Sequence, residues 1–110
     1  MTTEEKITKI VGALDDKKGT DIKVLKIADL TVLTEYFVIA TGTSTTQVRA
    51  LIDEVDYKLE EAGEKGKLEG KATDWKLIDF DDVIVHVFTP EARDFYNLEK
   101  LWADAEEISI

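Results

Sequence analysis

The sequence of 110 residues contains no cysteine and only one histidine. Without cysteine, the chain can form neither a disulfide framework nor a thiolate metal site. A single imidazole cannot build a histidine-rich metal centre, and no thiol is available as a catalytic nucleophile. These absences exclude cysteine-dependent catalysis and the usual zinc sites.

Basic residues are also scarce, since 14 lysines and arginines stand against 24 acidic residues and give a formal net charge of −10. Proteins that grip the phosphate backbone need clustered lysine and arginine, so this chain is poorly suited to bind nucleic acid directly. The acidic excess favours encounter with a basic partner, although the same excess also serves solubility alone.

No apolar run approaches the roughly 20 residues needed to cross a bilayer, so no membrane partner is expected. The N-terminal segment is acidic and helix-patterned, unlike the basic and then apolar profile of a signal peptide. Hydrophobic residues make up 44% and charged residues 35% of the chain, as in a soluble globular domain. We therefore expect one cytoplasmic domain spanning residues 1–110, long enough to bury a single core.

An amphipathic helix is predicted at residues 3–18, where apolar side chains recur at helical spacing. Thr2 and Glu5 have the spacing of a capping box at its start. Gly19 follows and is expected to stop the helix.

Two strands are predicted next, at residues 21–27 and 36–41. The apolar set of the first strand shifts phase, which indicates a bulge or burial on both faces. The second reads Y-F-V-I-A-T, a near-continuous apolar run typical of a central strand covered on both sides. A second helix is then expected between Ser44, which can form a capping box with Gln47, and Gly63.

The second half of the chain is organised around a predicted β-hairpin. Residues 75–80 and 83–88 are rich in β-branched and aromatic side chains and flank a turn of two aspartates. The polar residues 64–74 precede the hairpin and are expected to form an exposed loop, with room for a short strand at residues 67–70.

A last helix is expected to start at Pro90, with Thr89 as its N-cap. The pattern leaves open whether Asn97 divides this helix in two, and residues 106–110 are expected to form a short tail. The predicted order α-β-β-α-β-β-α indicates an α/β (α+β) fold, a small mixed sheet with helices packed on it.

Two places carry residue types used in small-molecule chemistry, and each also has an ordinary structural interpretation. Gly42 and Ser44 lie where a strand leads into a helix, a position that can hold an anion, but a P-loop lysine is absent and a serine cap explains the turn. Asp79, Asp81 and Asp82 could present carboxylates to Mg²⁺, yet aspartates at a turn commonly bond their own backbone.

His86 and Trp75 are the other two side chains of interest. His86 lies between two apolar residues on one strand face and is expected to be a partly buried, hydrogen-bonded structural histidine rather than a catalytic one. Trp75 opens a strand after a polar loop and shares a face with Leu77 and Asp79. Aromatic and aliphatic faces of this kind form interface hot spots, although the same pattern also fits ordinary core packing.

Four blocks of sequence form a specific combination that covers nearly the whole chain. They are Tyr36-Phe37-Val38-Ile39-Ala40-Thr41-Gly42 with Ser44, then Glu69-Gly70 and Trp75 before Leu77-Ile78-Asp79, then Asp82-Val83-Ile84-Val85-His86-Val87-Phe88, and finally Arg93-x-Phe95-Tyr96-x-Leu98-Glu99-x-Leu101-Trp102. In these blocks the chain resembles the family of ribosomal silencing factor S, also called the Iojap family.

The resemblance implies a fold similar to a truncated nucleotidyltransferase without the catalytic carboxylates, and a protein that is not an enzyme and uses no cofactor. It further implies a translation repressor that binds the large ribosomal subunit through ribosomal protein uL-fourteen. Occupying that site sterically blocks association of the large and small subunits and silences translation in starvation or stationary phase.

An acidic domain can approach a basic ribosomal protein while the surrounding RNA repels it, which gives partner choice by both attraction and repulsion. We therefore expect the hairpin to carry the docking surface, because it combines aromatic, aliphatic and acidic side chains. The six expected residues are Trp75, Leu77, Ile78, Asp79, Phe80 and Asp82.

The remaining family blocks are expected to be structural. One set should form the sheet core: Phe37, Val38 and Ile39. Another should form a helix stripe that covers the hairpin: Phe95, Leu98, Leu101 and Trp102. Arg93 and Glu99 either pair with each other or face a second copy, and a symmetric homodimer is expected if a hairpin face or a sheet edge stays uncovered.

Two other functions remain open at this point. The first is a small nucleotide-binding or nucleotidyl-transferring enzyme that uses Gly42, Ser44, Asp79 and Asp81. The second is an assembly factor for the large subunit, which would bind the same site on immature particles.

Overall fold

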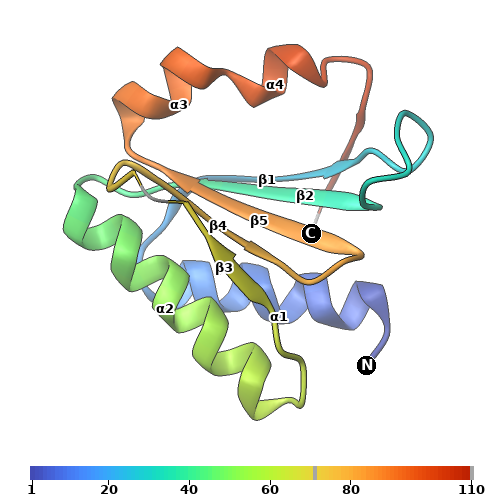
Figure 1. Ribbon diagram of the computed structural model, residues 1–110, viewed down its shortest axis with the longest axis horizontal. Helices are drawn as coiled ribbons and strands as arrows, with labels where there is room; N and C mark the ends of the chain where they lie inside the picture. Colours follow the sequence, from blue (N-terminus) through green and yellow to red (C-terminus); the bar gives the residue numbers. More distant parts are fainter. Residues whose placement is uncertain (71, 110) are drawn as a thin grey trace.

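The computed structural model describes residues 1–70 and 72–109 and centres on a parallel pair of strands, β2 (Tyr36–Thr41) and β5 (Val83–Phe88). Val38 and Val85 pair with each other and face one hydrophobic core, whereas Phe37 faces a second core on the other side of the sheet. Helices cover both faces at this point (Figure 1). The prediction of a central strand buried on both sides is therefore confirmed.

Six strands form one mixed sheet in the order β3-β4-β5-β2-β1-β6, and every pair except β2 and β5 is antiparallel. The register between β1 and β2 shifts between Thr20 and Lys23, which confirms the irregularity that the sequence indicates. The four outer strands are β1 (Thr20–Lys26), β3 (Lys67–Glu69), β4 (Trp75–Asp79) and β6 (Glu106–Ile108).

Two segments were expected to be irregular, the polar loop at residues 64–74 and the tail at residues 106–110. The short strand expected within residues 64–74 is confirmed as β3, whereas the prediction of a tail at residues 106–110 is wrong for residues 106–108, which pair with β1 as strand β6. Lys71 of the loop and Ile110 of the tail lie outside the described residues.

Helices α1 (Thr3–Asp16) and α2 (Thr45–Glu61) cover one face of the sheet and form the larger core with it (Figure 1). The capping box at the start of α1 is confirmed, since Glu5 N donates to Thr2 Oγ1 at 3.1 Å and Thr2 N donates to Glu5 Oε1 at 2.8 Å. The helix ends two residues earlier than expected, and Lys18, not Gly19, takes the left-handed backbone conformation with φ of 64°.

The opposite face carries α3 (Pro90–Tyr96) and α4 (Leu98–Leu101). Asn97 divides the two helices, because its backbone is left-handed with φ of 47° and its side-chain oxygen accepts from Lys100 N as the cap of α4. The continuous stripe expected along this segment is therefore wrong in part. Leu98 and Trp102 pack on the sheet, but Phe95 and Leu101 are 81% and 73% exposed, because the break at Asn97 interrupts the helical period.

Arg93 anchors this pair of helices to the sheet. Its Nη1 donates to the carbonyl of Asp21 and to Thr41 Oγ1, each at 2.7 Å, and its Nε donates to Glu99 Oε1 at 2.8 Å. Lys23 Nζ reaches the other oxygen of Glu99 at 3.0 Å. The hydrogen bond from Arg93 lowers the pKa of Glu99, so the carboxylate stays charged. Arg93 and Glu99 thus pair within one chain.

The substitution Arg93→Lys is expected to lower the free energy of unfolding by about 2–3 kcal/mol, because an ammonium group cannot reproduce the planar fork that reaches three acceptors. Urea unfolding measures this change. Arg49→Lys is the matched control, since Arg49 is exposed and its ion pair with Asp53 is long, at 3.8 Å. The free energy of unfolding is expected to change there by no more than about 0.5 kcal/mol. Equal losses in the two variants would contradict the anchoring role.

Candidate functional site

Helices α3 and α4 lie over β1, β2 and β5 and leave strand β4 only half covered. Every second residue of β4 faces this side of the sheet. These residues are Trp75, Leu77 and Asp79, and all three are half-buried. On the adjacent strand β5 their pairing partners are, in the same order, Phe88, His86 and Ile84. The structure therefore brings together three of the six residues that we expect at the docking surface.

Trp75 is surrounded by aromatic rings from β5 and α3. Its ring centroid lies 5.0 Å from that of Phe88 and 4.5 Å from that of Tyr96. Tyr96 in turn contacts the exposed Phe95 edge-to-face at 5.1 Å. The apolar surface thus continues from β4 onto α3. We call this surface the docking face, and its members are Trp75, Leu77, Asp79, Ile84, Phe95 and Tyr96.

The sequence reasoning missed Ile84, Phe95 and Tyr96 as members of this surface. One signal was available for the helix: two consecutive aromatic residues cannot both face the core from one helix, because adjacent positions point about 100° apart. The exposure of Ile84 has no comparable sequence signal, since it depends on how far α3 and α4 extend over β5.

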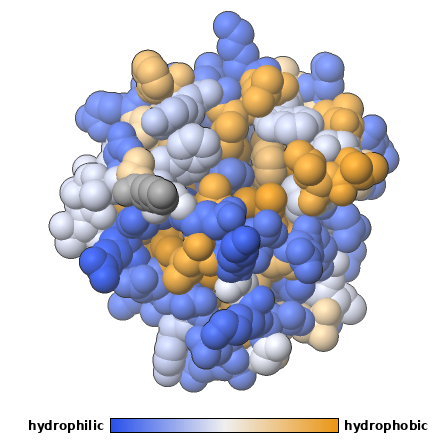
Figure 2. Space-filling model, viewed as in Figure 1, coloured by the Kyte–Doolittle hydropathy of each residue, from blue (hydrophilic) through white to orange (hydrophobic). Residues whose placement is uncertain are grey.

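Exposed large apolar side chains gather mainly in two places in the part of the chain that the structure describes. One is the segment of α3 and α4, with Phe95, Tyr96 and Leu101. The other is the loop between β1 and β2, seen at the right of Figure 2. Its exposed members are Leu30, Val32 and Leu33. Apolar clusters on an otherwise charged surface are typical of interaction sites.

Ile78 and Phe80, two of the six expected docking residues, lie on the opposite face of the hairpin. They are 0% and 6% exposed and pack in the larger core beneath α1 and α2. Strand alternation sends them away from Trp75, so they stabilise the hairpin from behind and do not share its open surface.

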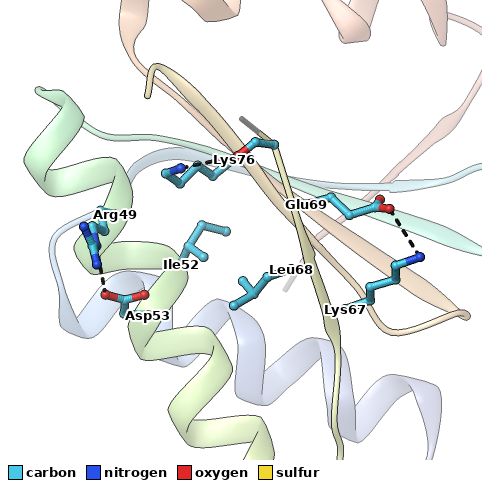
Figure 3. A pocket seen from close by; sticks show the side chains of 8 residues that line it. Arg49, Ile52, Asp53, Lys67, Leu68, Glu69 and Lys76 are labelled. Carbon is cyan, nitrogen blue, oxygen red and sulfur yellow. Dashed lines mark hydrogen bonds and ion pairs between the residues drawn. The ribbon is translucent and has the colours of Figure 1, made fainter. Parts of the chain in front are cut away.

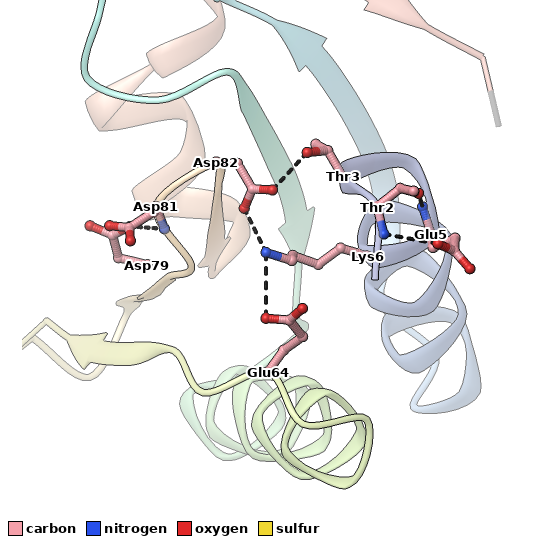
Figure 4. A network of polar contacts seen from close by, with 8 residues as sticks. All are labelled: Thr2, Thr3, Glu5, Lys6, Glu64, Asp79, Asp81 and Asp82. Carbon is pink, nitrogen blue, oxygen red and sulfur yellow. Dashed lines mark hydrogen bonds and ion pairs between the residues drawn. The ribbon is translucent and has the colours of Figure 1, made fainter.

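Asp82, the sixth expected residue, ties the hairpin turn to helix α1 (Figure 4). Lys6 Nζ donates to Asp82 Oδ1 at 2.8 Å, Thr3 Oγ1 donates to Oδ2 at 2.7 Å, and Glu64 lies 3.7 Å from Lys6. Burial alone would raise the pKa of Asp82, but the hydrogen bonds from Lys6 and Thr3 outweigh it and lower that pKa. The charge of Asp82 is therefore compensated inside the molecule.

The other turn aspartates fit the backbone-bonding interpretation. Asp79 Oδ1 accepts from Asp81 N at 2.8 Å, and Asp81 has a left-handed φ of 73°. Among residues 1–70 and 72–109, no three histidine, cysteine or acidic side chains are grouped closely enough to hold a metal ion.

The Gly42–Ser44 turn is filled by the chain's own side chains. Ser44 Oγ accepts from Gln47 N at 3.2 Å, and the side-chain oxygen of Gln47 accepts from Thr43 N and Thr43 Oγ1. The expected capping box is thus only half formed, because the side-chain oxygen of Gln47 accepts from Thr43 and not from Ser44 N, while its amide nitrogen donates to the carbonyls of Lys17 and Lys18. Two backbone donors that an anion would use are already taken.

A groove of about 810 Å³ opens on the far side of the sheet, between α2 and β3 (Figure 3). Arg49 and Asp53 form one ion pair in it, and Lys67 and Glu69 form another. Its lining offers no hydroxyl, thiol or imidazole group. The two carboxylates in the groove, Asp53 and Glu69, are thus each engaged by a basic side chain of the groove itself.

His86 lies beneath the docking face and is 5% exposed. Its Nδ1 accepts a hydrogen bond from the indole N–H of Trp75 at 3.2 Å, and the ring of Phe37 contacts it edge-to-face at 4.8 Å. Burial lowers the pKa of His86 to about 4, so the imidazole is neutral at physiological pH. The expectation of a buried histidine is confirmed.

Comparison with known proteins decides the family. Residues 1–110 match the family model described as "Ribosomal silencing factor during starvation". The chain belongs to this family.

Relatives and solved structures agree with this assignment. A ribosomal silencing factor from Halalkalibacterium halodurans is 38% identical over 112 residues, which cover 100% of this chain and 96% of that protein. A mouse protein named for mitochondrial assembly of the ribosomal large subunit is 35% identical and is matched over 87% of this chain and 44% of its own length. A crystal structure from Chromobacterium violaceum superposes with a TM-score of 0.91 at 40% identity, covering 100% of this chain and 92% of the other.

The comparisons confirm both the resemblance and the mixed α/β fold. The relatives are named for regulatory or assembly roles in connection with the ribosome and not for a catalysed reaction. In the described part of the chain, no helix is both long enough and apolar enough to cross a membrane.

Lowering the pH from 7 to 5 is expected to reduce the free energy of unfolding by about 2 kcal/mol through His86 alone. The unfolded imidazole binds a proton near pH 6.5, whereas the folded one resists protonation until the pH approaches its pKa of about 4. The contribution of His86 is therefore fully present above pH 6.5 and is lost as the pH falls toward 4. Urea unfolding at both pH values measures it. The His86→Leu variant should not show this loss of about 2 kcal/mol between pH 7 and pH 5. If the variant kept the pH dependence of the parent chain, the loss could not be ascribed to His86.

Proposed function

We propose that this chain binds the large ribosomal subunit through ribosomal protein uL-fourteen and sterically blocks association with the small subunit, acting in the cytoplasm in starvation or stationary phase. Its membership of the silencing-factor family supports a role on the ribosome. The observation that carries the proposal is the docking face, an open aromatic and aliphatic surface on an otherwise acidic molecule.

The docking face has the make-up of an interface hot spot. Trp75 is half-buried and held by Phe88, Tyr96 and His86, so little side-chain entropy remains to be lost when a partner covers it. Phe95 extends the surface outward and is free to be covered. Buried aromatic anchors surrounded by contacts that exclude water supply most of the energy of such interfaces.

Charge supports a protein partner over RNA. The net charge of −10 attracts a basic ribosomal protein, whereas the phosphate groups of the surrounding ribosomal RNA repel the acidic chain. Asp79 places one carboxylate within the docking face itself. Binding should therefore combine an apolar centre with an acidic border, which favours a basic protein surface that has an exposed apolar patch.

A role in assembly of the large subunit is the second candidate, and the name of the mouse relative favours it. It uses the same surface and differs in the particle that is bound. Binding to mature large subunits that prevents joining supports silencing, whereas binding confined to immature particles supports assembly. The open face is equally available to a second copy of the chain, and sedimentation of the free protein reports that homodimer.

Trp75→Ala and Phe95→Ala are each expected to weaken binding to purified large subunits. A hot-spot aromatic is worth about 2 kcal/mol or more, which is nearly thirtyfold in affinity. Co-sedimentation with separated large and small subunits measures binding, and subunit joining is followed in the same samples.

Tyr57→Ala is the matched control, because Tyr57 is an exposed aromatic on α2, on the opposite side of the sheet. Its variant should bind and inhibit joining as the parent chain does. Folding of each variant is checked by thermal unfolding. Unchanged affinity in folded Trp75→Ala and Phe95→Ala would rule out the docking face.

A further inference from the structure

His86 makes a single side-chain hydrogen bond in the described part of the chain, and this bond goes to Trp75. Because Nδ1 accepts the indole proton of Trp75, the proton of the neutral imidazole resides on Nε2. That Nε2 atom is buried and has no hydrogen-bond partner among the described residues. One nitrogen of the ring is thus used and the other is left unsatisfied.

Stability alone does not account for a histidine at this place. A buried N–H group without a partner is destabilising, because it has lost its hydrogen bond to water. The residues on either side of it along the same strand face, Ile84 and Phe88, are apolar, as is the contacting Phe37. A leucine would fill the site without the unsatisfied Nε2–H group, but it would leave the indole N–H of Trp75 without its acceptor. The histidine therefore supplies something that an apolar side chain does not, namely an acceptor for Trp75.

We propose that His86 is a positioning residue of the docking face, which fixes the orientation of the Trp75 indole through the Nε1–H to Nδ1 hydrogen bond. This inference rests on the proposed function. Phe88 stacks on the indole ring and Tyr96 contacts it at a tilt of 45°, but such aromatic contacts alone tolerate rotation within the ring plane and flips of the ring. The hydrogen bond removes that freedom, because it requires the N–H edge to point at β5. A partner then meets one orientation of the tryptophan and not several.

The decisive pair of variants is His86→Leu and His86→Asn. The two side chains have nearly the same shape, but the amide oxygen of asparagine can stand where Nδ1 accepts from Trp75, whereas leucine has no acceptor. His86→Leu is expected to bind large subunits about five- to tenfold more weakly, the value of one hydrogen bond, without losing thermal stability at pH 7. His86→Asn is expected to bind within about twofold of the parent chain.

A spectroscopic measurement follows the hydrogen bond itself. The chain has two tryptophans, so a ¹H–¹⁵N correlation spectrum shows two indole N–H signals, and Trp102→Phe assigns them. The signal of Trp75 should move and exchange faster with water in His86→Leu, and should stay close to its original position in His86→Asn. A purely structural histidine predicts no parallel between this signal and binding.

Trp75→Phe removes the donor of the same hydrogen bond and keeps an aromatic ring at this position. It should weaken binding, and adding His86→Leu to it should cause little further loss, because the two substitutions remove one interaction. Additive losses would overturn the inference, as would normal binding by folded His86→Leu. If Trp75→Ala itself leaves affinity unchanged, the proposed function fails; if Trp75→Ala weakens binding and His86→Leu does not, only the positioning role fails.

Discussion

The guanidinium group of Arg93 ties the C-terminal helices to one part of the sheet and leaves another part open. It joins α3 to the carbonyl of Asp21, to the hydroxyl of Thr41 and to Glu99, so that the C-terminal helices are held over β1 and β2. Helices held there shield the apolar side chains of the central strands, and Tyr96 of α3 contacts Trp75 of β4. The buried arginine, together with the apolar contacts of Leu98 and Trp102, thus holds the helices where they leave β4 half covered.

The two faces of the hairpin have separate tasks. Behind it, Ile78 and Phe80 anchor the strand in the larger core, and Asp82 connects the turn to Lys6 of α1. These contacts make the support rigid. On the docking face, Trp75 stacks on Phe88 and donates a hydrogen bond to His86. A surface that is ordered before binding loses less entropy when a partner covers it, which suits the proposed role in blocking subunit association.

Local patterns predicted much of this arrangement, and long-range packing accounts for the rest. The apolar run at residues 36–41 and the helix between Ser44 and Gly63 were predicted correctly, because burial on one or two faces leaves a direct periodic signal. The alternation of the hairpin already separates Ile78 and Phe80 from Trp75, and the expected docking surface mixed the two faces. Strand β6 carries no such signal, since three exposed or half-exposed residues become a strand only through pairing with β1. The break of the helical stripe at Asn97, after which Leu101 is exposed, is a point that the sequence left open.

Site-specific photo-crosslinking tests the central claim most directly. A photoreactive amino acid at position 77 lies within the docking face, and the same group at position 57 lies on α2, on the opposite side of the sheet. After mixing with large ribosomal subunits and illumination, the crosslinked partner is identified by mass spectrometry. The account predicts a crosslink from position 77 to ribosomal protein uL-fourteen and none from position 57. A crosslink from position 77 to ribosomal RNA or to another protein, or a crosslink to uL-fourteen from position 57 alone, would contradict it.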